Sequence, residues 1–296
     1  MKILHFAPVS SNTTEGLSQS IVNLVTAQSK NGHDVGLITV RTSEKIVGDE
    51  VFWKSWDNKS LFNLFFYNPF NKIKNEFGIP DIINLHDIYN LKQIFILRHA
   101  IKSKFRIFIT PRGSFSPVAL KRSKIKKLIF INLFIKPHIR NIEGFVALNK
   151  GEEFFIKNLF HKKTIIIGNG IKNNKRIFEI NSLAFDEKNN SNEYSIGFVG
   201  RFDVHIKGLD TLLKAYVEYQ KESQLRNIKL VFLGEHRIKN NEYDSNKYFE
   251  FIRNQLKNSS LFQVIPAIYG DDKYKEISKF DLLIQPSRTE GMPNSV

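Results

Sequence analysis

The chain alternates between short apolar runs rich in β-branched and aromatic residues and longer segments with the periodicity of an amphipathic helix. This alternation is typical of parallel α/β units, in which a helix connects each strand to the next. In the first half, strands are predicted near Ile3–Pro8, Val35–Val40, Asp81–His86, Arg106–Pro111, Gly144–Leu148 and Thr164–Ile167. In the second half, they are predicted near Ser195–Gly200, Lys229–Gly234, Phe262–Pro266 and Asp281–Gln285. We therefore predict an α/β fold with two parallel sheets.

A polar segment separates the two series of strands. Residues 172–193 are rich in asparagine and lysine, which is typical of a connecting segment. We predict a first domain over 1–171, a linker over 172–193 and a second domain over 194–296. A chain of 296 residues is long enough for two domains of ordinary size. Because a doubly wound sheet commonly has about five or six strands, we expect the second domain to be incomplete.

Composition narrows the class of protein. Hydrophobic residues make up 42% of the chain and charged residues 25%, so packed cores are expected. The absence of cysteine excludes disulfides, thiolate metal sites and a cysteine nucleophile. There is no uncharged apolar run of roughly 18 residues and no signal-peptide pattern at the start. We therefore expect a cytoplasmic protein.

The net charge of +15 predicts an anionic partner, which is a nucleic acid, an anionic membrane surface or a phosphorylated substrate. No zinc-finger spacing, RNA-binding aromatic motif or basic zipper is present, so nucleic acid is disfavoured. No Asp-x-Asp lies in a setting suited to a nucleotide-bound metal, and Asp271-Asp272 is predicted to cap a helix. We therefore predict neither a metal nor any other cofactor.

Two cations follow the first strand of the second domain. That strand ends in Gly-Phe-Val-Gly-Arg-Phe (197–202), and a helix is predicted to begin within His-Ile-Lys-Gly-Leu-Asp (205–210). Arg201 and Lys207 would lie at the carboxyl edge of the sheet, where open α/β sheets bind ligands. Two cations beside helix N-terminal amides suit a diphosphate, and Gly208 lets the backbone come close. The plainer alternative is a pair of surface cations in a basic protein.

A second polar string, Pro-Ser-Arg-Thr-Glu-Gly-Met-Pro-Asn-Ser (286–295), follows the last predicted strand. Pro293 suits the first turn of a helix, where a missing N–H is no loss. Amides of Asn294 and Ser295 would then face an anion. Glu290 precedes this turn, and the plainer alternative for it is a solvated loop carboxylate.

These two strings resemble the donor-binding motifs of retaining glycosyltransferases of the family-4 type. The resemblance extends over nearly the whole chain and is strongest over 195–296. The resemblance implies a GT-B architecture of two Rossmann-like domains. It also implies transfer of a sugar from a nucleotide diphosphate to an acceptor hydroxyl with retention, with Glu290 beside the sugar. The donor-binding residues that it implies are Arg201, Lys207, Gly208, Gly291, Asn294 and Ser295. The family's second glutamate would lie past Val296, so we expect no measurable transfer from residues 1–296.

The resemblance also implicates the first domain. Gly16 joins the first strand to the first helix and would admit a donor phosphate or sugar, although the family usually has two glycines at this turn. His86 is a candidate catalytic residue, because the family has a histidine near the transferred sugar at this point; a structural histidine is the alternative. Arg112, Gly113 and Ser114 match a family loop that faces the cleft, and they are candidates for binding the acceptor or a phosphate.

The stretch Lys121–Lys136 is basic and then apolar. It is either a helix that packs on the core with a solvated start, or a basic helix that lies on an anionic membrane leaflet. In the resembled family the acceptor is often lipid-linked. The expected partners are therefore a nucleotide-sugar donor, a sugar or lipid-linked acceptor and an anionic membrane surface. The expected setting is bacterial surface polysaccharide synthesis, of lipopolysaccharide or capsule.

Three other functions remain open from the sequence. The chain could be a sugar-nucleotide epimerase on the same architecture, an inactive or partial fragment of a transferase, or a basic surface-binding protein. The Gly-Arg-Phe and Glu-Gly-Met-Pro strings argue against the epimerase.

Overall fold

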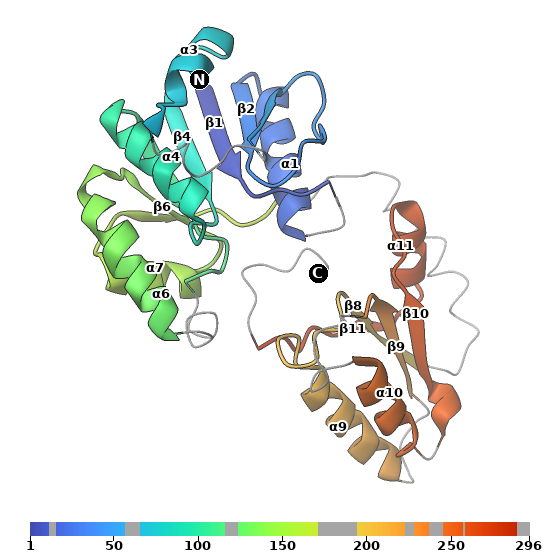
Figure 1. Ribbon diagram of the computed structural model, residues 1–296. Coiled ribbons are helices and arrows are strands. Elements are labelled where there is room, and N and C mark those ends of the chain that lie inside the picture. The colour runs from blue at the N-terminus through green and yellow to red at the C-terminus, as the bar shows by residue number, and fades with distance from the viewer. Residues whose placement is uncertain are drawn as a thin grey trace. The chain divides into compact units, whose positions relative to one another are not determined.

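Figure 1 shows the computed structural model of the chain. The structure describes residues 1–11, 16–56, 66–115, 124–170, 194–222, 228–236, 245–256 and 258–288. The described part of the chain divides into two compact units, one within residues 1–170 and the other within residues 194–288. The predicted linker, 172–193, lies outside the described residues.

In the first unit, seven described strands form a parallel sheet in the order β3-β2-β1-β4-β5-β6-β7. Their bounds are β1 Lys2–Ala7, β2 Asp34–Thr39, β3 Phe52–Ser55, β4 Ile82–His86, β5 Arg106–Thr110, β6 Gly144–Ala147 and β7 Thr164–Ile166. The order runs outward from β1 to β3 and then from β4 to β7, so β1 and β4 form a topological switch point. Open α/β sheets bind ligands outside the carboxyl ends of the strands at such a point.

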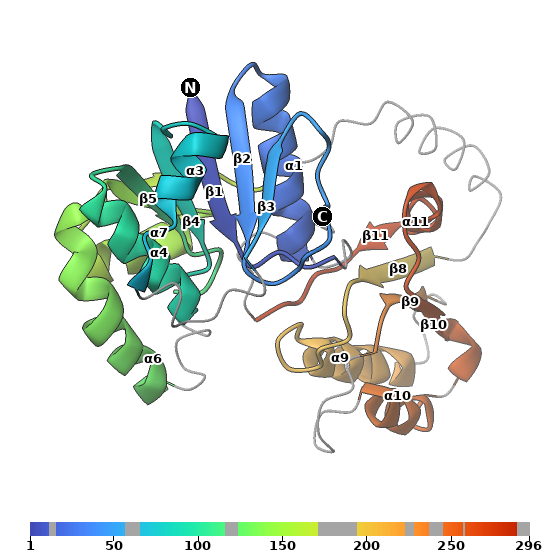
Figure 2. The ribbon, with the colours of Figure 1, turned by 45° about the horizontal axis from the view of Figure 1, so that its top comes forward.

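Helices lie on both faces of this sheet (Figure 2). Their bounds are α1 Gly16–Lys30, α3 Phe70–Glu76, α4 Leu91–Lys102, α6 Lys124–Phe130 and α7 Lys150–Phe160. After α6 the backbone changes to a π-helical turn, Ile131–Ile135, and a 3-10 helix, Lys136–Asn141. Asparagine side chains accept backbone N–H groups at the starts of α4 and α7, which is a stabilising N-cap.

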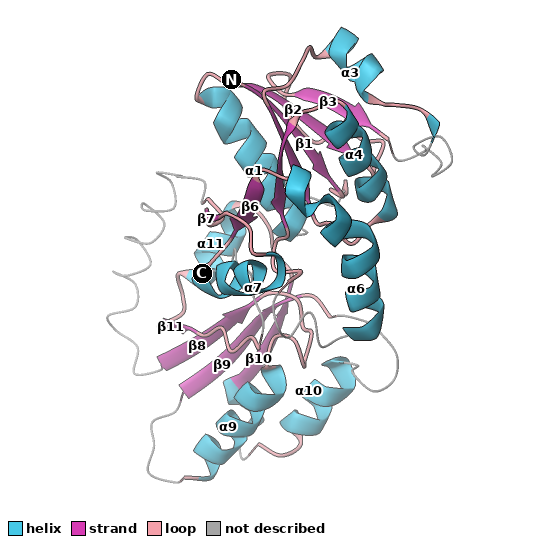
Figure 3. Ribbon diagram, turned by 90° about the vertical axis from the view of Figure 1, so that its left-hand side faces the viewer, coloured by secondary structure: helices cyan, strands magenta, loops and turns pink. Residues whose placement is uncertain are grey.

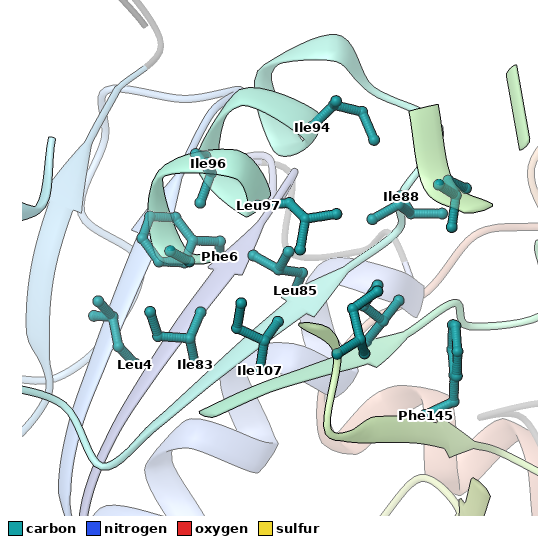
Figure 4. Packing of buried hydrophobic residues seen from close by; sticks show 14 of the residues in the cluster. Leu4, Phe6, Ile83, Leu85, Ile88, Ile94, Ile96, Leu97, Ile107 and Phe145 are labelled. Carbon is teal, nitrogen blue, oxygen red and sulfur yellow. The ribbon is translucent and has the colours of Figure 1, made fainter. Parts of the chain in front are cut away.

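Two hydrophobic clusters cover opposite faces of the sheet. Alternate residues of a strand point to opposite faces, so Val35 and Leu37 of β2 join the cluster under α1, whereas Ile38 joins the cluster under α4. Figure 4 shows the larger cluster, in which α4 packs its apolar side chains onto β1, β4 and β5. Packing on both faces fixes the positions of the strands, and so of the residues that follow their carboxyl ends.

The second unit contains a four-stranded parallel sheet in the order β10-β9-β8-β11. Its strands are β8 Tyr194–Val199, β9 Ile228–Gly234, β10 Phe262–Pro266 and β11 Leu282–Leu283. Its helices are α9 Leu209–Lys221, α10 Ser245–Arg253 and α11 Asp271–Ile277, with a 3-10 turn at Ser259–Leu261. α9 and α10 pack their apolar side chains on one face of the sheet, and α11 lies on the other (Figure 3).

The predicted α/β fold with parallel sheets is confirmed, and the predicted strands match to within one residue except the last. That strand was predicted over Asp281–Gln285 but pairs only at Leu282 and Leu283. The short edge strand β3 was not predicted, because its four residues are only partly buried and show no alternation. Asp271 and Asp272 do not cap α11 as predicted, because Gly270 occupies the N-cap and both aspartates lie in the first turn. Among the described residues, no helix is long and apolar enough to cross a membrane.

Candidate functional site

In the second unit, the loops that follow β8 and β11 meet at the carboxyl edge of the sheet, because these two strands are adjacent and parallel. The loop after β8 carries Arg201, which is exposed, and Lys207, which is partly buried. Two bonds from Asp203 shape this loop: its carbonyl oxygen accepts the N–H of Lys207 at 2.9 Å, and its side chain accepts the N–H of Ile206 at 3.1 Å. These bonds hold the backbone of Lys207 immediately before α9.

Gly208 is the N-cap of α9 and has left-handed backbone angles, with φ of 66°. A Cβ atom at this position would lie 2.1 Å from the carbonyl oxygen of Pro286, so no side chain fits without a shift. The loop after β11 therefore rests directly on the loop after β8. The close approach observed at Gly208 is to the backbone of the neighbouring loop. The predicted approach of Gly208 to a donor phosphate stays a prediction.

Arg288 joins the same two loops. Its Nη1 and Nη2 atoms donate to the two carboxylate oxygens of Asp210 at 2.6 and 2.8 Å, and Nη1 also donates to the carbonyl of His205 at 2.7 Å. The backbone N–H of Arg288 donates to the carbonyl of Ile206 at 3.0 Å. The hydrogen bonds from Arg288 lower the pKa of the Asp210 carboxyl group. This bidentate pair fixes the segment that leads into Glu290.

In the first unit, Arg112 is the centre of the polar residues at the carboxyl ends of β4 and β5. Its Nε donates to Nδ1 of His86 at 3.2 Å. Its Nη1 donates to Oγ of Ser20 at 3.1 Å and to Oδ1 of Asn169 at 2.8 Å. These three acceptors are uncharged, whereas the carboxylate of Glu152 acts on the guanidinium electrostatically and favours its charged form. Burial lowers the pKa of Arg112 to about 10, and the side chain stays a cation at neutral pH.

The backbone at this edge is unusual. Asp87 follows β4 with φ of 58°, and Arg112 follows β5 with φ of 53°. Left-handed conformations are costly for residues other than glycine, and they concentrate at functional sites where the surroundings enforce them. Gly113 continues the turn with φ of 86°, which glycine adopts without strain. Two adjacent loops are thus held in strained shapes beside the same cation.

Two carboxylates brace the loop that carries Arg112. Glu152, which is buried at the start of α7, accepts the backbone N–H groups of Gly113 at 2.5 Å and Leu148 at 2.9 Å. Asp87 accepts the hydroxyl of Ser114 at 3.2 Å. Burial raises the pKa of both carboxyl groups. The backbone N–H of Gly113 and the hydroxyl of Ser114 therefore hold the shape of the loop. Contact of either residue with a substrate stays a prediction.

His86 is fully buried, and both of its ring nitrogens are engaged. Nδ1 accepts from Arg112, and Nε2 lies 2.9 Å from Nδ1 of His5. An imidazole without exposed surface does not touch a sugar in this conformation. The predicted catalytic role of His86 therefore needs either a rearrangement or an indirect action through Arg112.

Of the remaining predicted site residues, only Gly16 lies within the described residues. Gly16 is the first residue of α1, and its carbonyl oxygen accepts the hydroxyl of Ser20 at 2.9 Å. Glu290, Gly291, Asn294 and Ser295 lie outside the described residues. No group of three or more metal-ligating side chains occurs in the part of the chain that the structure describes.

Sequence reasoning missed Arg288, Asp210, Glu152 and His5. For Arg288, a basic residue inside the Pro-Ser-Arg-Thr-Glu string was a usable signal. Asp210 ends the His-Ile-Lys-Gly-Leu-Asp string, which was an equal signal. Glu152 and His5 are brought into place by contacts between residues that are distant in sequence, and nothing local marks them.

Comparison with known proteins gives one family match, and it falls mainly on the second unit. Residues 179–296 match the family described as glycosyl transferases group 1. No curated protein matches the chain significantly.

Several solved structures share the fold. Sucrose-phosphate synthase from Thermosynechococcus elongatus aligns with a TM-score of 0.68 and 15% identity, over 99% of this chain and 77% of that one. The catalytic domain of starch synthase IV from Arabidopsis thaliana, bound to ADP and acarbose, aligns with a TM-score of 0.63 and 15% identity, over 100% and 80%. A UDP-forming trehalose-phosphate synthase from Burkholderia xenovorans, in complex with glucose-6-phosphate, gives 0.64 and 12%, over 100% and 81%.

Each unit therefore has the Rossmann-like α/β fold found in GT-B proteins. The family match covers less than half of the chain and falls mainly on the second unit.

Proposed function

We propose that the protein is a retaining glycosyltransferase that moves a sugar from a nucleotide-diphosphate donor to an acceptor hydroxyl. The observation that carries this proposal is the pair Arg201 and Lys207, held before α9 at the carboxyl edge of a sheet in a glycosyltransferase group 1 domain. When the bond between the sugar and the diphosphate breaks, negative charge develops on the leaving phosphate. The two cations beside the N-terminus of α9 would stabilise that charge without a metal. Glu290 would accept hydrogen bonds from the sugar.

The ligands of the neighbouring structures support the choice of substrates. The starch synthase was solved with ADP, and the trehalose-phosphate synthase is described as UDP-forming and holds glucose-6-phosphate. By analogy, we infer a nucleotide-sugar donor and a sugar acceptor for this chain. The test is incubation with a panel of UDP-, ADP- and GDP-sugars and sugar acceptors, followed by NMR of the anomeric proton in the product. Release of nucleoside diphosphate with an inverted product, or none with any donor, would contradict the proposal.

Arg112 is proposed to bind an oxyanion of the substrate in the first unit. Its hydrogen-bond partners are neutral, and Glu152, whose charge acts on it, accepts backbone amides, so the guanidinium can still bind a phosphate or carboxylate group. A charge-assisted hydrogen bond contributes about 1.5–3 kcal/mol. The group could belong to a phosphorylated acceptor or to the donor, and the prediction that follows distinguishes these sources.

We expect Arg112→Gln to weaken the binding of sugar phosphates at least about tenfold and to leave the matching neutral sugars unaffected. Calorimetry with each pair of acceptors measures this. Arg106→Gln is the matched control, because Arg106 lies at the opposite, amino end of β5. A loss confined to nucleoside diphosphates would assign the oxyanion to the donor instead. An equal loss for charged and neutral sugars would remove the anion-binding role.

A membrane-facing surface is proposed on α6. This helix buries none of its residues, although the π-helical turn after it packs Ile131 and Ile135 into the core. The exposed apolar side chains share one helix face at intervals of three and four residues, and they are Ile125, Leu128, Ile129 and Leu133. Lys124 and Lys126 are exposed beside them. A helix with an apolar face flanked by lysines suits an anionic leaflet, where a lipid-linked acceptor would be found.

We therefore expect the protein to sediment with anionic but not with neutral liposomes. Each lysine near an anionic surface contributes about 1 kcal/mol, so replacing Lys124, Lys126 and Lys127 by glutamate should reduce partitioning on the order of a hundredfold. Ile125→Ser with Ile129→Ser tests the apolar part separately at unchanged charge. Equal binding to neutral vesicles, or none to anionic vesicles, would refute the surface. We propose on this basis that the protein works at the inner face of the plasma membrane, and by its resemblance to family-4 transferases that it serves polysaccharide synthesis.

A further inference from the structure

A chain of hydrogen bonds runs through the interior of the first unit from α1 to Arg112. Oε1 of Gln28 lies 2.8 Å from Nε2 of His5. Nδ1 of His5 lies 2.9 Å from Nε2 of His86. Nδ1 of His86 accepts the Nε–H of Arg112 at 3.2 Å. His5 and His86 come from the adjacent strands β1 and β4, and their rings are stacked.

The chemistry of the two ends fixes the direction of every bond in this chain. The Nε atom of an arginine donates only, so Nδ1 of His86 accepts and carries no proton. The proton of a neutral His86 is then on Nε2, which donates to Nδ1 of His5. The proton of a neutral His5 is then on Nε2, which donates to the carbonyl oxygen of Gln28. With both imidazoles neutral, this single arrangement satisfies all three contacts.

The surroundings keep both imidazoles neutral. His5 and His86 are 1% and 0% exposed, and this burial lowers the pKa of His5 to about 4 and that of His86 well below its ordinary value. The positive charge of Arg112 acts in the same direction on both. Two carboxylates lie nearby: Asp87 accepts the hydroxyl of Ser114, and Glu152 accepts two backbone amides and acts electrostatically on Arg112. Neither is hydrogen-bonded to an imidazole of the pair.

The tautomer of His86 affects the orientation of the Arg112 guanidinium. Nε is used by His86, and Nη1 is used by Ser20 and Asn169. Among the described residues, Nη2 has no hydrogen-bond partner. If His86 changed its tautomer, its Nδ1–H would face the Nε–H of Arg112, and the guanidinium would lose the contact that sets its plane.

We propose that His86, His5 and Gln28 are positioning residues that act through Arg112, orienting its guanidinium so that Nη2 meets an oxyanion of the substrate. This inference rests on the oxyanion-binding role of Arg112 proposed above. It gives His86 an indirect role, and it brings in two residues, His5 and Gln28, that lie outside the predicted site.

The first test is NMR of the protein selectively labelled with ¹⁵N in the histidine rings, at neutral pH. We expect both His5 and His86 to be neutral with the proton on Nε2, and we assign their signals from the variants His5→Phe and His86→Phe. An Nδ1–H tautomer or an imidazolium at either residue would overturn the proposal. This readout needs no activity and no donor, so it is independent of the transferase assignment.

The second test titrates inorganic phosphate and follows the Nδ1 signal of His86, which reports only on the neighbourhood of Arg112. In the wild type we expect a saturable response. His5→Phe keeps the ring but removes the acceptor of His86, and it should weaken the phosphate affinity at least about threefold. Because Arg112→Gln should abolish the response, adding His5→Phe to it should change nothing more. His99→Phe replaces a buried histidine of α4 that is not part of the hydrogen-bonded series from Gln28 to Arg112, and it should leave the affinity unchanged.

The outcomes separate the two levels of inference. An unchanged phosphate affinity in His5→Phe, or an equal loss in His99→Phe, would overturn the positioning role. The absence of any phosphate response in the wild type would overturn the oxyanion role of Arg112 and the positioning role with it. Neither result bears on the donor site of the second unit, which is tested with its own ligands.

Discussion

Replacing Arg201 or Lys207 by alanine is expected to weaken binding of a sugar nucleotide at least about tenfold each, because a charge-assisted phosphate contact contributes about 1.5–3 kcal/mol. The double variant should lose at least about a hundredfold if the two cations contact different phosphate oxygens. Calorimetry with a panel of sugar nucleotides measures these affinities. The effect should be smaller for nucleoside monophosphates, which present less charge to the pair.

Lys214→Ala is the matched control for this prediction. Lys214 is exposed on α9, so its removal changes the net charge equally without touching the loop after β8. If Lys214→Ala weakened binding as much as Lys207→Ala, the effect would be one of general charge. Unchanged affinity in both Arg201→Ala and Lys207→Ala would remove these residues from the donor site.

Gly208→Ala is expected to lower the free energy of unfolding of the second unit by about 2–4 kcal/mol. A left-handed residue with a Cβ costs about 1–2 kcal/mol, and the 2.1 Å approach to Pro286 adds the cost of overpacking. Any relaxation must separate the loops after β8 and β11, so donor affinity should fall as well. Chemical denaturation of the second unit and calorimetry measure the two effects.

Gly32→Ala separates the backbone effect from the clash. Gly32 follows α1 with φ of 80°, and a Cβ atom there would meet nothing within 4 Å. This substitution should cost only about 1 kcal/mol, from the left-handed conformation alone. A Gly208→Ala variant as stable as wild type and with full donor affinity would show that the loops after β8 and β11 are not coupled through this contact.

The sequence predicted the parts of the fold that depend on local pattern. Buried parallel strands read as continuous apolar runs, so the strands from β1 to β10 were found, except for β3. β3 lies at the sheet edge with partly buried residues, and edge strands carry a weaker apolar signal. The start of α9 was predicted because Gly208 and the residues beside it form a recognisable string.

The candidate site was predicted only where its residues are close in sequence. Arg112, Gly113 and Ser114 were identified as one loop, and the structure places them in one turn. Their support comes from elsewhere: Glu152 lies 39 residues after Gly113, and the partner of His86 is 81 residues before it. Such contacts depend on strand order, which a single sequence does not reveal. For the same reason, the full burial of His86 could not be foreseen from its position at a strand end.

The most direct test of the central claim is hydrogen exchange of the whole chain with and without a saturating nucleoside diphosphate, resolved by mass spectrometry. If the carboxyl edge of the second sheet is the donor site, exchange should slow in peptides covering residues 200–209 and 284–288. Peptides covering α10 and β10 should be unchanged, and the protection should disappear in the variant with both Arg201→Ala and Lys207→Ala. Protection elsewhere in the chain without protection of the first two segments, or protection that survives in the double variant, would contradict the account.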